Sequence, residues 1–183
     1  MSNTRKYILT PGVFNIGRKI LLACAAMSAV LGTLQLTAAA NDTLLKRGKY
    51  IVSIAGCGDC HTPGYLLGKP DISRSLGGSE VGFEIPGLGV FHGPNLTPDN
   101  ETGLGKWTAD EIVTAFQTGK RPDGRELAPI MPWRNFASFT PEDAQAIAAY
   151  LKSLPPIANK VPGPFGPTDK PTSFVMKVVP PGN

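Results

Sequence analysis

A C-x-x-C-H motif at residues 57–61 constrains this chain more than any other feature of its sequence. The motif places Cys57 and Cys60 three residues apart, with His61 directly after them. This spacing is the attachment signature of c-type haem. Two thiols add to the two vinyl groups of the porphyrin, and the adjacent histidine reaches the iron from one face. The motif therefore predicts one covalently bound haem c, with Cys57 and Cys60 as its attachment points and His61 as an axial iron ligand.

Three other interpretations of the cysteine pair remain open. A thioredoxin-like redox pair occurs in a βαβ setting, whereas an amphipathic helix is predicted before Cys57. A zinc site needs further ligands, and His92 is the only other histidine of the chain. A structural disulfide suits an oxidising compartment, but it gives no reason for a histidine at position 61. The haem interpretation accounts for all three residues of the motif.

The first 40 residues have the pattern of an export signal. They contain four basic residues and no acidic one, then an apolar, alanine-rich stretch up to Leu36 and a run of small residues that ends at Ala40. This order is typical of a secretory signal. We expect residues 1–40 to be a signal peptide cleaved after Ala40, which discards Cys24 and makes the protein periplasmic. The alternative is an uncleaved membrane anchor, because Ile20–Ala40 is long enough to cross a bilayer.

The charge balance argues against nucleic acid as a partner. The chain has 18 Lys and Arg residues and 14 Asp and Glu residues, and the four basic residues of the leader leave 14 of each sign for the remainder. Nucleic-acid-binding domains carry a basic patch. A domain that is formally neutral is not expected to bind nucleic acid.

Apolar periodicity and capping residues predict three helices after the leader. Thr108 and Glu111 form the pattern of a capping box, and Gly119 is placed to end that helix. Thr140 is a cap followed by Pro141 at the first helical position. The three predicted helices run from about Asp42 to Ala55, from Thr108 to Gly119 and from Thr140 to Pro155.

The rest of the chain is predicted to be loop. Residues 62–93 contain eight glycines and no sustained period, and residues 155–183 contain eight prolines, which indicates an extended tail that adds nothing to the core. Three modest helices give a thin core, and the apolar disc of a haem would complete it. The predicted segments are a signal peptide at 1–40, a haem domain at 41–155 and a proline-rich extended tail at 156–183.

The second axial ligand decides whether a haem transfers electrons or binds small molecules. After the leader, the candidates are Met131, Met176 and His92. Met131 has a proline close on each side, and such a stiff loop can hold a thioether against iron, whereas Met176 lies in the tail and His92 in the glycine-rich loop. We predict His61 and Met131 as the axial iron ligands. The open alternatives are a core-filling role for Met131 and bis-histidine ligation through His92.

Residues 42–155 resemble the class I cytochromes c. Segments 48–50 and 148–151 resemble the crossed terminal helices of that family, in which a glycine allows close approach and an aromatic side chain packs on it. The resemblance implies an all-α class I cytochrome c fold, with three main helices and long loops around one covalently bound haem. The haem domain at 41–155 is then a cytochrome c domain.

The resemblance also implies a partner for the proximal histidine. Residues 93–96 resemble the family segment whose proline carbonyl accepts the Nδ1–H of that histidine, so Pro94 is expected to orient His61. The 32 residues between His61 and Pro94 exceed those of small family members. Such an insertion can cover a haem edge or dock a partner.

A narrower resemblance rests on four segments, at residues 95–99, 103–108, 124–125 and 131–132. They are similar to the repeating unit in the cytochrome subunits of bacterial membrane alcohol and gluconate dehydrogenases. Those subunits carry three such units and this chain carries one. Trp107, Arg125 and Trp133 are candidates for contacts with the haem ring or propionates. The equally open alternatives are packing for the two tryptophans and a solvated surface for Arg125.

Together these features predict a periplasmic electron-transfer protein rather than an enzyme. Its partners would be redox proteins, such as a periplasmic dehydrogenase and a terminal oxidase or another cytochrome. The first alternative is a cytochrome c subunit of a periplasmic or membrane-bound dehydrogenase complex, with membrane association through that partner or through an uncleaved leader. The second is a haem enzyme or gas sensor with an open distal site.

Overall fold

The computed structural model describes residues 39–181. The expected signal peptide, Cys24 and almost all of the leader lie outside the described residues, so its cleavage after Ala40 stays a prediction. The chain divides into a unit of residues 1–42 and a unit of residues 43–183. In the first unit only residues 39–42 are described, and they are helical. All other described elements belong to the second unit.

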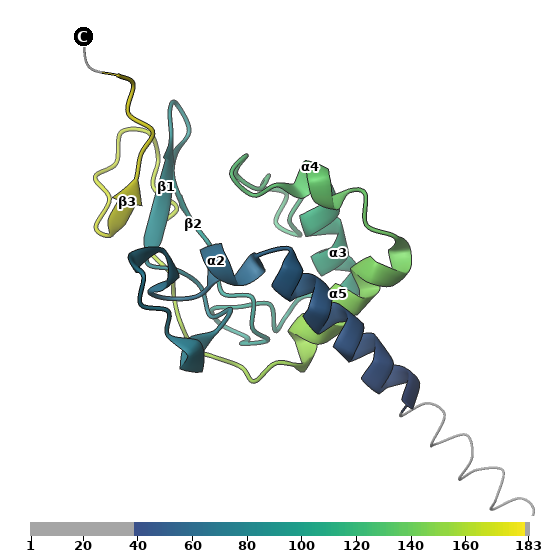
Figure 1. The fold of residues 1–183 in the computed structure, drawn as a ribbon. Helices are drawn as coiled ribbons and strands as arrows, with labels where there is room; N and C mark the ends of the chain where they lie inside the picture. Colours follow the sequence, from purple (N-terminus) through teal and green to yellow (C-terminus); the bar gives the residue numbers. More distant parts are fainter. Residues whose placement is uncertain (1–38, 182–183) are drawn as a thin grey trace, which may run out of the picture. The chain divides into compact units, whose positions relative to one another are not determined.

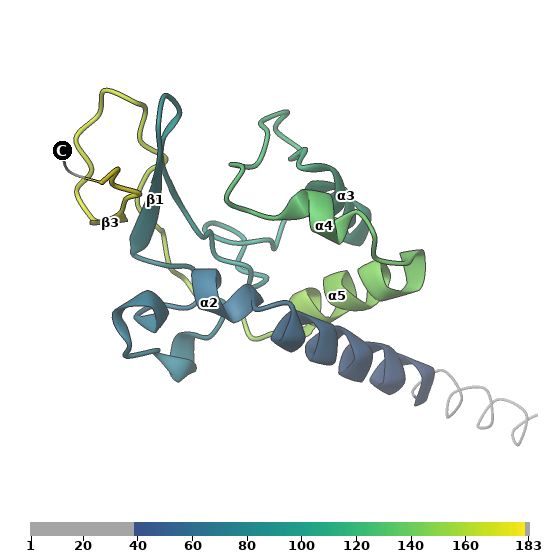
Figure 2. The ribbon, with the colours of Figure 1, turned by 45° about the horizontal axis from the view of Figure 1, so that its top comes forward.

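The first helix and the last helix of the second unit cross in close contact. Residues 43–54 are helical, and helix α5 covers Pro141–Ser153; the two lie side by side in both ribbon views (Figures 1 and 2). At the crossing, a Cβ on Gly48 would overlap the carbonyl oxygen of Ala146 and would lie 2.7 Å from Tyr150 Cβ. The expected approach of a glycine to an aromatic residue on the last helix is thereby confirmed.

Helix α3, Ala109–Thr118, has the ends that its sequence indicates. Thr108 Oγ1 accepts a hydrogen bond from Glu111 N, and Glu111 Oε2 accepts one from Thr108 N, which completes the capping box. Gly119 ends the helix in the left-handed region with φ of 77°. Helix α5 likewise begins at the Thr140 cap, with Pro141 at its start. Short helices α2, Cys57–His61, and α4, Trp133–Phe136, and two 3₁₀ turns, Tyr65–Leu67 and Ile72–Arg74, complete the helical elements.

The hydrophobic core lies where these helices meet. Most of its members lie on the apolar faces of the predicted helices, and Leu76 and Leu104 are added by loops. Burying each large side chain stabilises the fold by about 1.5–3 kcal/mol. The buried members are Ile51, Val52, Leu76, Leu104, Ile112, Phe116, Ala144, Ile147, Ala148 and Leu151.

A small sheet corrects the expectation of an all-α fold. Strands β1, Val81–Ile85, and β2, Gly89–His92, form an antiparallel hairpin, and β3, Phe174–Met176, pairs with β1 in parallel. The strand order is β2-β1-β3. The hairpin falls within the glycine-rich segment that was expected to be loop.

The glycines of this hairpin explain why its strands could not be recognised in the sequence. A Cβ on Gly82 would collide with the His92 ring, and one on Gly89 would overlap the carbonyl oxygen of Phe165. Glycine is needed at these strand positions because other parts of the chain pack directly on the backbone. The same residues break the alternation by which strands are recognised.

The tail also departs from its expectation. It is extended, but it contributes β3 to the sheet, and Phe165 forms a bridge with Val90 of β2. Nearer its start, the backbone of Ile157 hydrogen-bonds to the buried residues Asn95 and Thr97. Prolines exclude helix here but leave carbonyl oxygens and selected N–H groups free to pair. Across residues 39–181, no helix is both long and apolar enough to span a bilayer.

Candidate haem site

Helix α2 carries the two cysteines and the histidine of the motif. It follows Gly56, whose φ of 66° turns the chain sharply out of the preceding helix. Cys57 and Cys60 lie one helical turn apart, and neither forms a disulfide. Within residues 39–181, no group of three or more His, Cys, Asp or Glu side chains is arranged to hold a metal ion. Neither the disulfide nor the zinc interpretation of the motif gains support.

Both thiols lie in surroundings that disfavour charge. Burial raises the pKa of Cys57 to about 11, and burial together with the nearby Asp59 carboxylate raises the pKa of Cys60. Cys57 is half-buried and packs against the hydrophobic core. Both cysteines are therefore in the neutral thiol form, and Cys57 faces the apolar cluster.

His61 is buried and held in one orientation. Its side chain is 5% exposed, and Nδ1 donates a 2.7 Å hydrogen bond to the carbonyl oxygen of Pro94. Because a carbonyl can only accept, the proton lies on Nδ1 and the lone pair on Nε2. Nε2 makes no hydrogen bond to any described residue, and burial lowers the pKa of the ring. A neutral imidazole with an oriented, unpartnered Nε2 lone pair is the form that binds a metal.

The approach of the Pro94 segment depends on a glycine. A Cβ on Gly93 would overlap the carbonyl oxygen of Cys60 and would lie 3.4 Å from His61 Nδ1. Only glycine lets the backbone pass this close to α2. Gly93 thus delivers the Pro94 carbonyl to the histidine, the kind of second contact that orients a metal ligand.

Met131 lies in a loop that hydrogen bonds brace on both sides. Its N–H donates to the carbonyl of Ala128 at 2.9 Å, and its own carbonyl accepts from Trp133 N at 2.8 Å. Its side chain is half-buried and packs against the core cluster that Cys57 also contacts. The structure therefore brings Met131 and Cys57 to the same apolar cluster from opposite ends of the domain's sequence.

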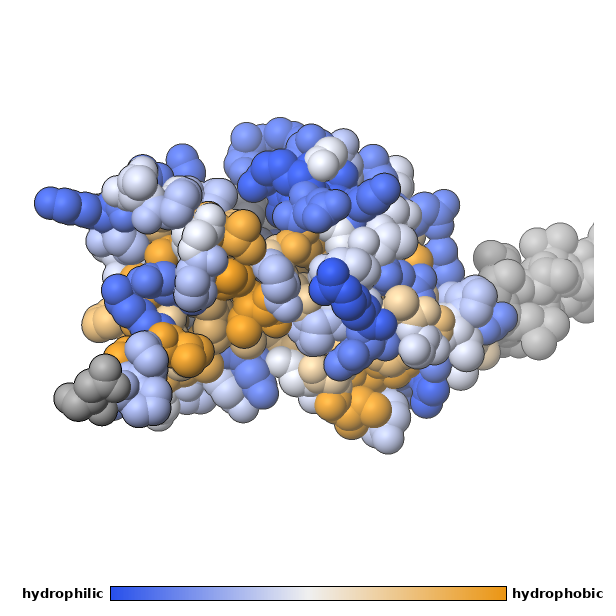
Figure 3. Space-filling model, turned by 90° about the horizontal axis from the view of Figure 1, so that it is seen from above, coloured by the Kyte–Doolittle hydropathy of each residue, from blue (hydrophilic) through white to orange (hydrophobic). Residues whose placement is uncertain are grey.

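A cavity of about 220 Å³ lies beside this loop, between it and the hairpin. Leu88 at the hairpin turn and Ile130 in the loop are both about half exposed. Apolar side chains reach the surface in patches on the face seen from above, with hydrophilic ones between them (Figure 3). The lining residues of the cavity are Leu88, Phe91, Glu126, Leu127, Ala128, Pro129, Trp133 and Arg134.

The other candidate ligands have different surroundings. His92 lies in β2 rather than in a loop, and its Nε2 pairs with Ser173 Oγ at 2.7 Å. Its Nδ1 is buried and has no hydrogen-bond partner among the described residues. Met176 lies in β3 with 46% of its surface exposed. The pairing with Ser173 thus occupies Nε2 of His92 and ties its ring to the tail.

The three candidates for haem contacts make contacts within the protein. Trp107 packs against the core, with the Arg121 guanidinium 5.2 Å from its ring. Trp133 lies under the guanidinium of its neighbour Arg134 at 4.2 Å. Arg125 is exposed and forms an ion pair with Asp123. Packing contacts therefore exist for both tryptophans, and a surface ion pair for Arg125.

Sequence reasoning missed three polar residues that hold the loops of the site. Asn95 and Thr97 are each 1% exposed and fully engaged in hydrogen bonds. Lys152 Nζ donates to the carbonyls of Gly105 and Trp107 at 2.9 and 2.8 Å. Asn95 and Thr97 belong to the N-x-T-P-D sequence at residues 95–99, directly after Pro94. Asparagine and threonine side chains in such turns hydrogen-bond to nearby groups, so this sequence was the signal for both residues. Nothing in the sequence distinguishes Lys152 from a surface lysine.

In the comparison with known proteins, one family model covers all the residues of this site. The cytochrome c family model matches residues 45–155. The chain is 33% identical over 149 residues to the cytochrome c subunit of the quinone alcohol dehydrogenase of Gluconobacter oxydans strain 621H, a match that covers 80% of this chain and 29% of that protein.

Two further relatives are subunits or electron carriers of related kinds. The chain is 34% identical over 138 residues to the cytochrome c subunit of gluconate 2-dehydrogenase from Pantoea cypripedii, covering 73% of this chain and 29% of the relative. It is 31% identical over 110 residues to a dihaem cytochrome c-type protein of Cereibacter sphaeroides, covering 60% and 36%. The chain thus spans about 29% of the length of the dehydrogenase subunits. With its C-x-x-C-H helix, its oriented His61 and the matched residues 45–155, this chain belongs to the cytochrome c family, whose domain carries covalently bound haem and transfers electrons.

Proposed function

We propose that this chain carries single electrons in the periplasm on one haem c, attached through Cys57 and Cys60 and ligated by His61 and Met131. The observation that carries the proposal is the state of His61, which is buried, fixed by Pro94 through Nδ1 and unpartnered at Nε2 beside two free thiols. When bound, haem supplies a one-electron redox couple in the ferric and ferrous states of its iron. The protein contributes orientation of the ligand and an apolar, water-poor setting.

Two observations favour Met131 over the other candidates for the second ligand. Met131 packs on the same cluster as Cys57 and its backbone is pinned on both sides. His92 Nε2 is engaged with Ser173, and Met176 stands half exposed on the outer strand of the sheet. A thioether ligand raises the reduction potential and leaves no coordination position open. Such a site favours electron transfer over the binding of oxygen or carbon monoxide.

Substitution of Met131 tests this ligand set. We expect the ferric wild-type protein to show the sulfur–iron charge-transfer band and the ferrous protein not to bind carbon monoxide. Met131→Ala should lose the band and gain carbon monoxide binding, while the matched control Met176→Ala should behave as wild type. Ready carbon monoxide binding by the wild-type protein would instead favour a haem enzyme or gas sensor with an open distal site.

The names of the relatives favour a more specific role, as the electron-accepting cytochrome subunit of a periplasmic dehydrogenase. A tagged chain purified from its host in mild detergent, with co-purifying proteins identified by mass spectrometry, tests this role. A stoichiometric dehydrogenase would establish it. Recovery of the chain alone from the soluble periplasmic fraction would favour a free electron shuttle.

We also propose the division of the chain into a signal peptide at 1–40, a cytochrome c domain at 41–155 and a tail at 156–183. The family match at 45–155 supports the middle segment. N-terminal sequencing of the periplasmic protein should give Asn41 as its first residue. A membrane-bound protein that retains Met1 would show that the leader is an anchor.

A further inference from the structure

Residues 157–161, here called the tail clamp, fasten two backbone segments that both hold His61. One segment supplies the carbonyl that fixes the imidazole ring, and the other bonds the backbone of His61 itself. The clamp follows helix α5, so it is far from both of these segments in the sequence.

The first connection runs through Asn95, the residue next to Pro94. Asn95 Nδ2 donates to the carbonyl oxygen of Ile157 at 2.6 Å and to Thr102 Oγ1 at 3.0 Å. Asn95 Oδ1 accepts from Thr97 Oγ1 at 2.7 Å, and Ile157 N donates to Thr97 Oγ1 at 3.0 Å. Asn95 and Thr97 are buried and their side chains are hydrogen-bonded, so the network holds the backbone after Pro94 in one position.

The second connection runs through Gly77 and Gly78. Asn159 Nδ2 donates to the carbonyl oxygen of Gly77 at 2.7 Å, and the adjacent Gly78 N donates to the carbonyl oxygen of His61 at 2.8 Å. A Cβ on Gly78 would collide with Val161 Cγ1, so the clamp packs directly on this backbone. The clamp therefore restrains the main chain of His61 as well as its ring.

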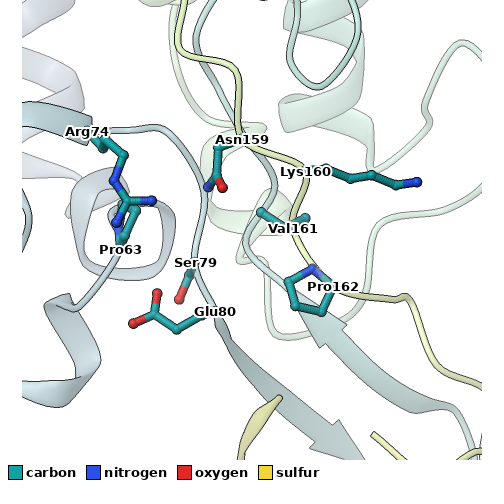
Figure 4. Close-up of a pocket in the computed structure, with 8 residues that line it drawn as sticks. All are labelled: Pro63, Arg74, Ser79, Glu80, Asn159, Lys160, Val161 and Pro162. Carbon is teal, nitrogen blue, oxygen red and sulfur yellow. The ribbon is translucent and has the colours of Figure 1, made fainter. Parts of the chain in front are cut away.

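The clamp and the loop of residues 74–80 are not packed against each other along their whole length. A cavity of about 430 Å³ remains between them, with the clamp along one wall and the loop along the other (Figure 4). Its walls include Asn159, Val161 and Pro162 on the tail side and Arg74, Ser79 and Glu80 on the loop side. Beside the cavity, the hydrogen bond from Asn159 to Gly77 and the contact of Val161 with Gly78 link the clamp to the loop.

We propose that Ile157 and Asn159 are positioning residues for His61, an inference that rests on the proposed role of His61 as an iron ligand. Ile157 holds the segment that carries the Pro94 carbonyl, and Asn159 restrains the main chain of His61 through Gly77 and Gly78. Together they keep Nδ1 at hydrogen-bond distance from that carbonyl and so keep the imidazole electron-rich. A hydrogen bond from the far nitrogen of a ligating histidine raises its basicity. An electron-rich ligand stabilises the ferric state, so loosening the clamp raises the reduction potential.

The test uses two variants of the clamp and one matched control. Asn159→Ala removes the bond to Gly77, and Ile157→Pro removes the N–H that bonds to Thr97. Asp169→Ala is the control, because it removes a 2.7 Å hydrogen bond to Gly166 N in the same tail, away from the clamp. The readouts are the reduction potential of the purified holoprotein and the exchange rate of the His61 Nδ1 proton with solvent deuterium, followed by NMR.

We expect both clamp variants to raise the potential and to speed Nδ1 proton exchange by about tenfold or more through local opening, with no change in Asp169→Ala. Wild-type potential and exchange in Asn159→Ala would overturn the inference, as would equal shifts in the control. If Ile157→Pro gives no holoprotein, Asn159→Ala decides, since it deletes only one side-chain amide. Absence of covalent, His61-ligated haem from the wild-type protein would overturn the proposed function itself, and the inference with it.

Discussion

Gly48 and Ala146 meet backbone to backbone, with no room for a side chain between them. Gly48→Ala should therefore force the two helices apart despite the better helix propensity of alanine. We expect it to lower the free energy of unfolding by about 1–3 kcal/mol, the range for overpacking. Urea unfolding followed by circular dichroism measures the change. The control is Gly58→Ala in helix α2, whose new Cβ would lie 3.5 Å from Thr62 Oγ1, an ordinary contact, and which should not lower stability.

Lys152 should stabilise the fold far more than an ordinary surface lysine. Its ammonium group donates to backbone carbonyls in the turn that carries Trp107. Lys152→Met would leave those carbonyls without a donor, at a cost of about 1–3 kcal/mol in the free energy of unfolding. Lys106→Met removes only an exposed ion pair with Glu101 and should change it by less than about 0.5 kcal/mol. Equal losses in both variants would contradict this account.

The ion pair between Arg47 and Asp143 predicts a dependence of stability on pH. The hydrogen bond and charge of Arg47 lower the pKa of Asp143 below its ordinary value of 3.8. The folded state therefore binds fewer protons than the unfolded state at this site, and the stabilisation is present above pH 3.8 and lost as pH falls through the lowered pKa.

Arg47→Met should accordingly be less stable than wild type at neutral pH, and the difference should shrink as pH falls below 3.8. Thermal unfolding of both proteins across this range measures it. Lys49→Met on the same helix is the control, because Lys49 forms no ion pair with another described residue. A difference that is constant with pH would show that Arg47 acts through packing rather than through charge.

Two truncations should show which part of the tail stabilises the fold. Ending the chain after Gly166 removes β3 but keeps the bonds of Ile157 and Asn159. Ending it after Leu154 also leaves the buried amide of Asn95 without its carbonyl partner, which adds about 1–3 kcal/mol to the loss of stability. Urea unfolding of both forms gives the comparison. Equal stability of the two forms would show that residues 155–166 contribute nothing to the fold.

Local signals explain why the helices could be predicted from the sequence. The capping box of Thr108 and Glu111, the left-handed Gly119 and the Thr140 cap each involve residues within one turn of one another. The C-x-x-C-H motif is equally local. These features depend on neighbouring residues, so the sequence displays them directly.

The hairpin and the tail contacts depend instead on parts of the chain that meet only in the folded protein. In the sequence, Gly82 indicates a loop. Only the structure shows that the His92 ring occupies the space that a side chain at position 82 would need. The carbonyl of Ile157 carries no side-chain signal for its bond to Asn95. The hydrogen bond from His61 to Pro94 was expected only because residues 93–96 resemble a known segment; spacing alone does not give it.

The parallel pairing of β1 with β3 joins Val81 to Phe174, near the end of the chain. Strand β1 therefore has a neighbour on each edge, β2 on one side and β3 on the other. Because an open strand edge can pair with a strand of another chain, β3 covers the edge of β1 that would otherwise be available for such pairing.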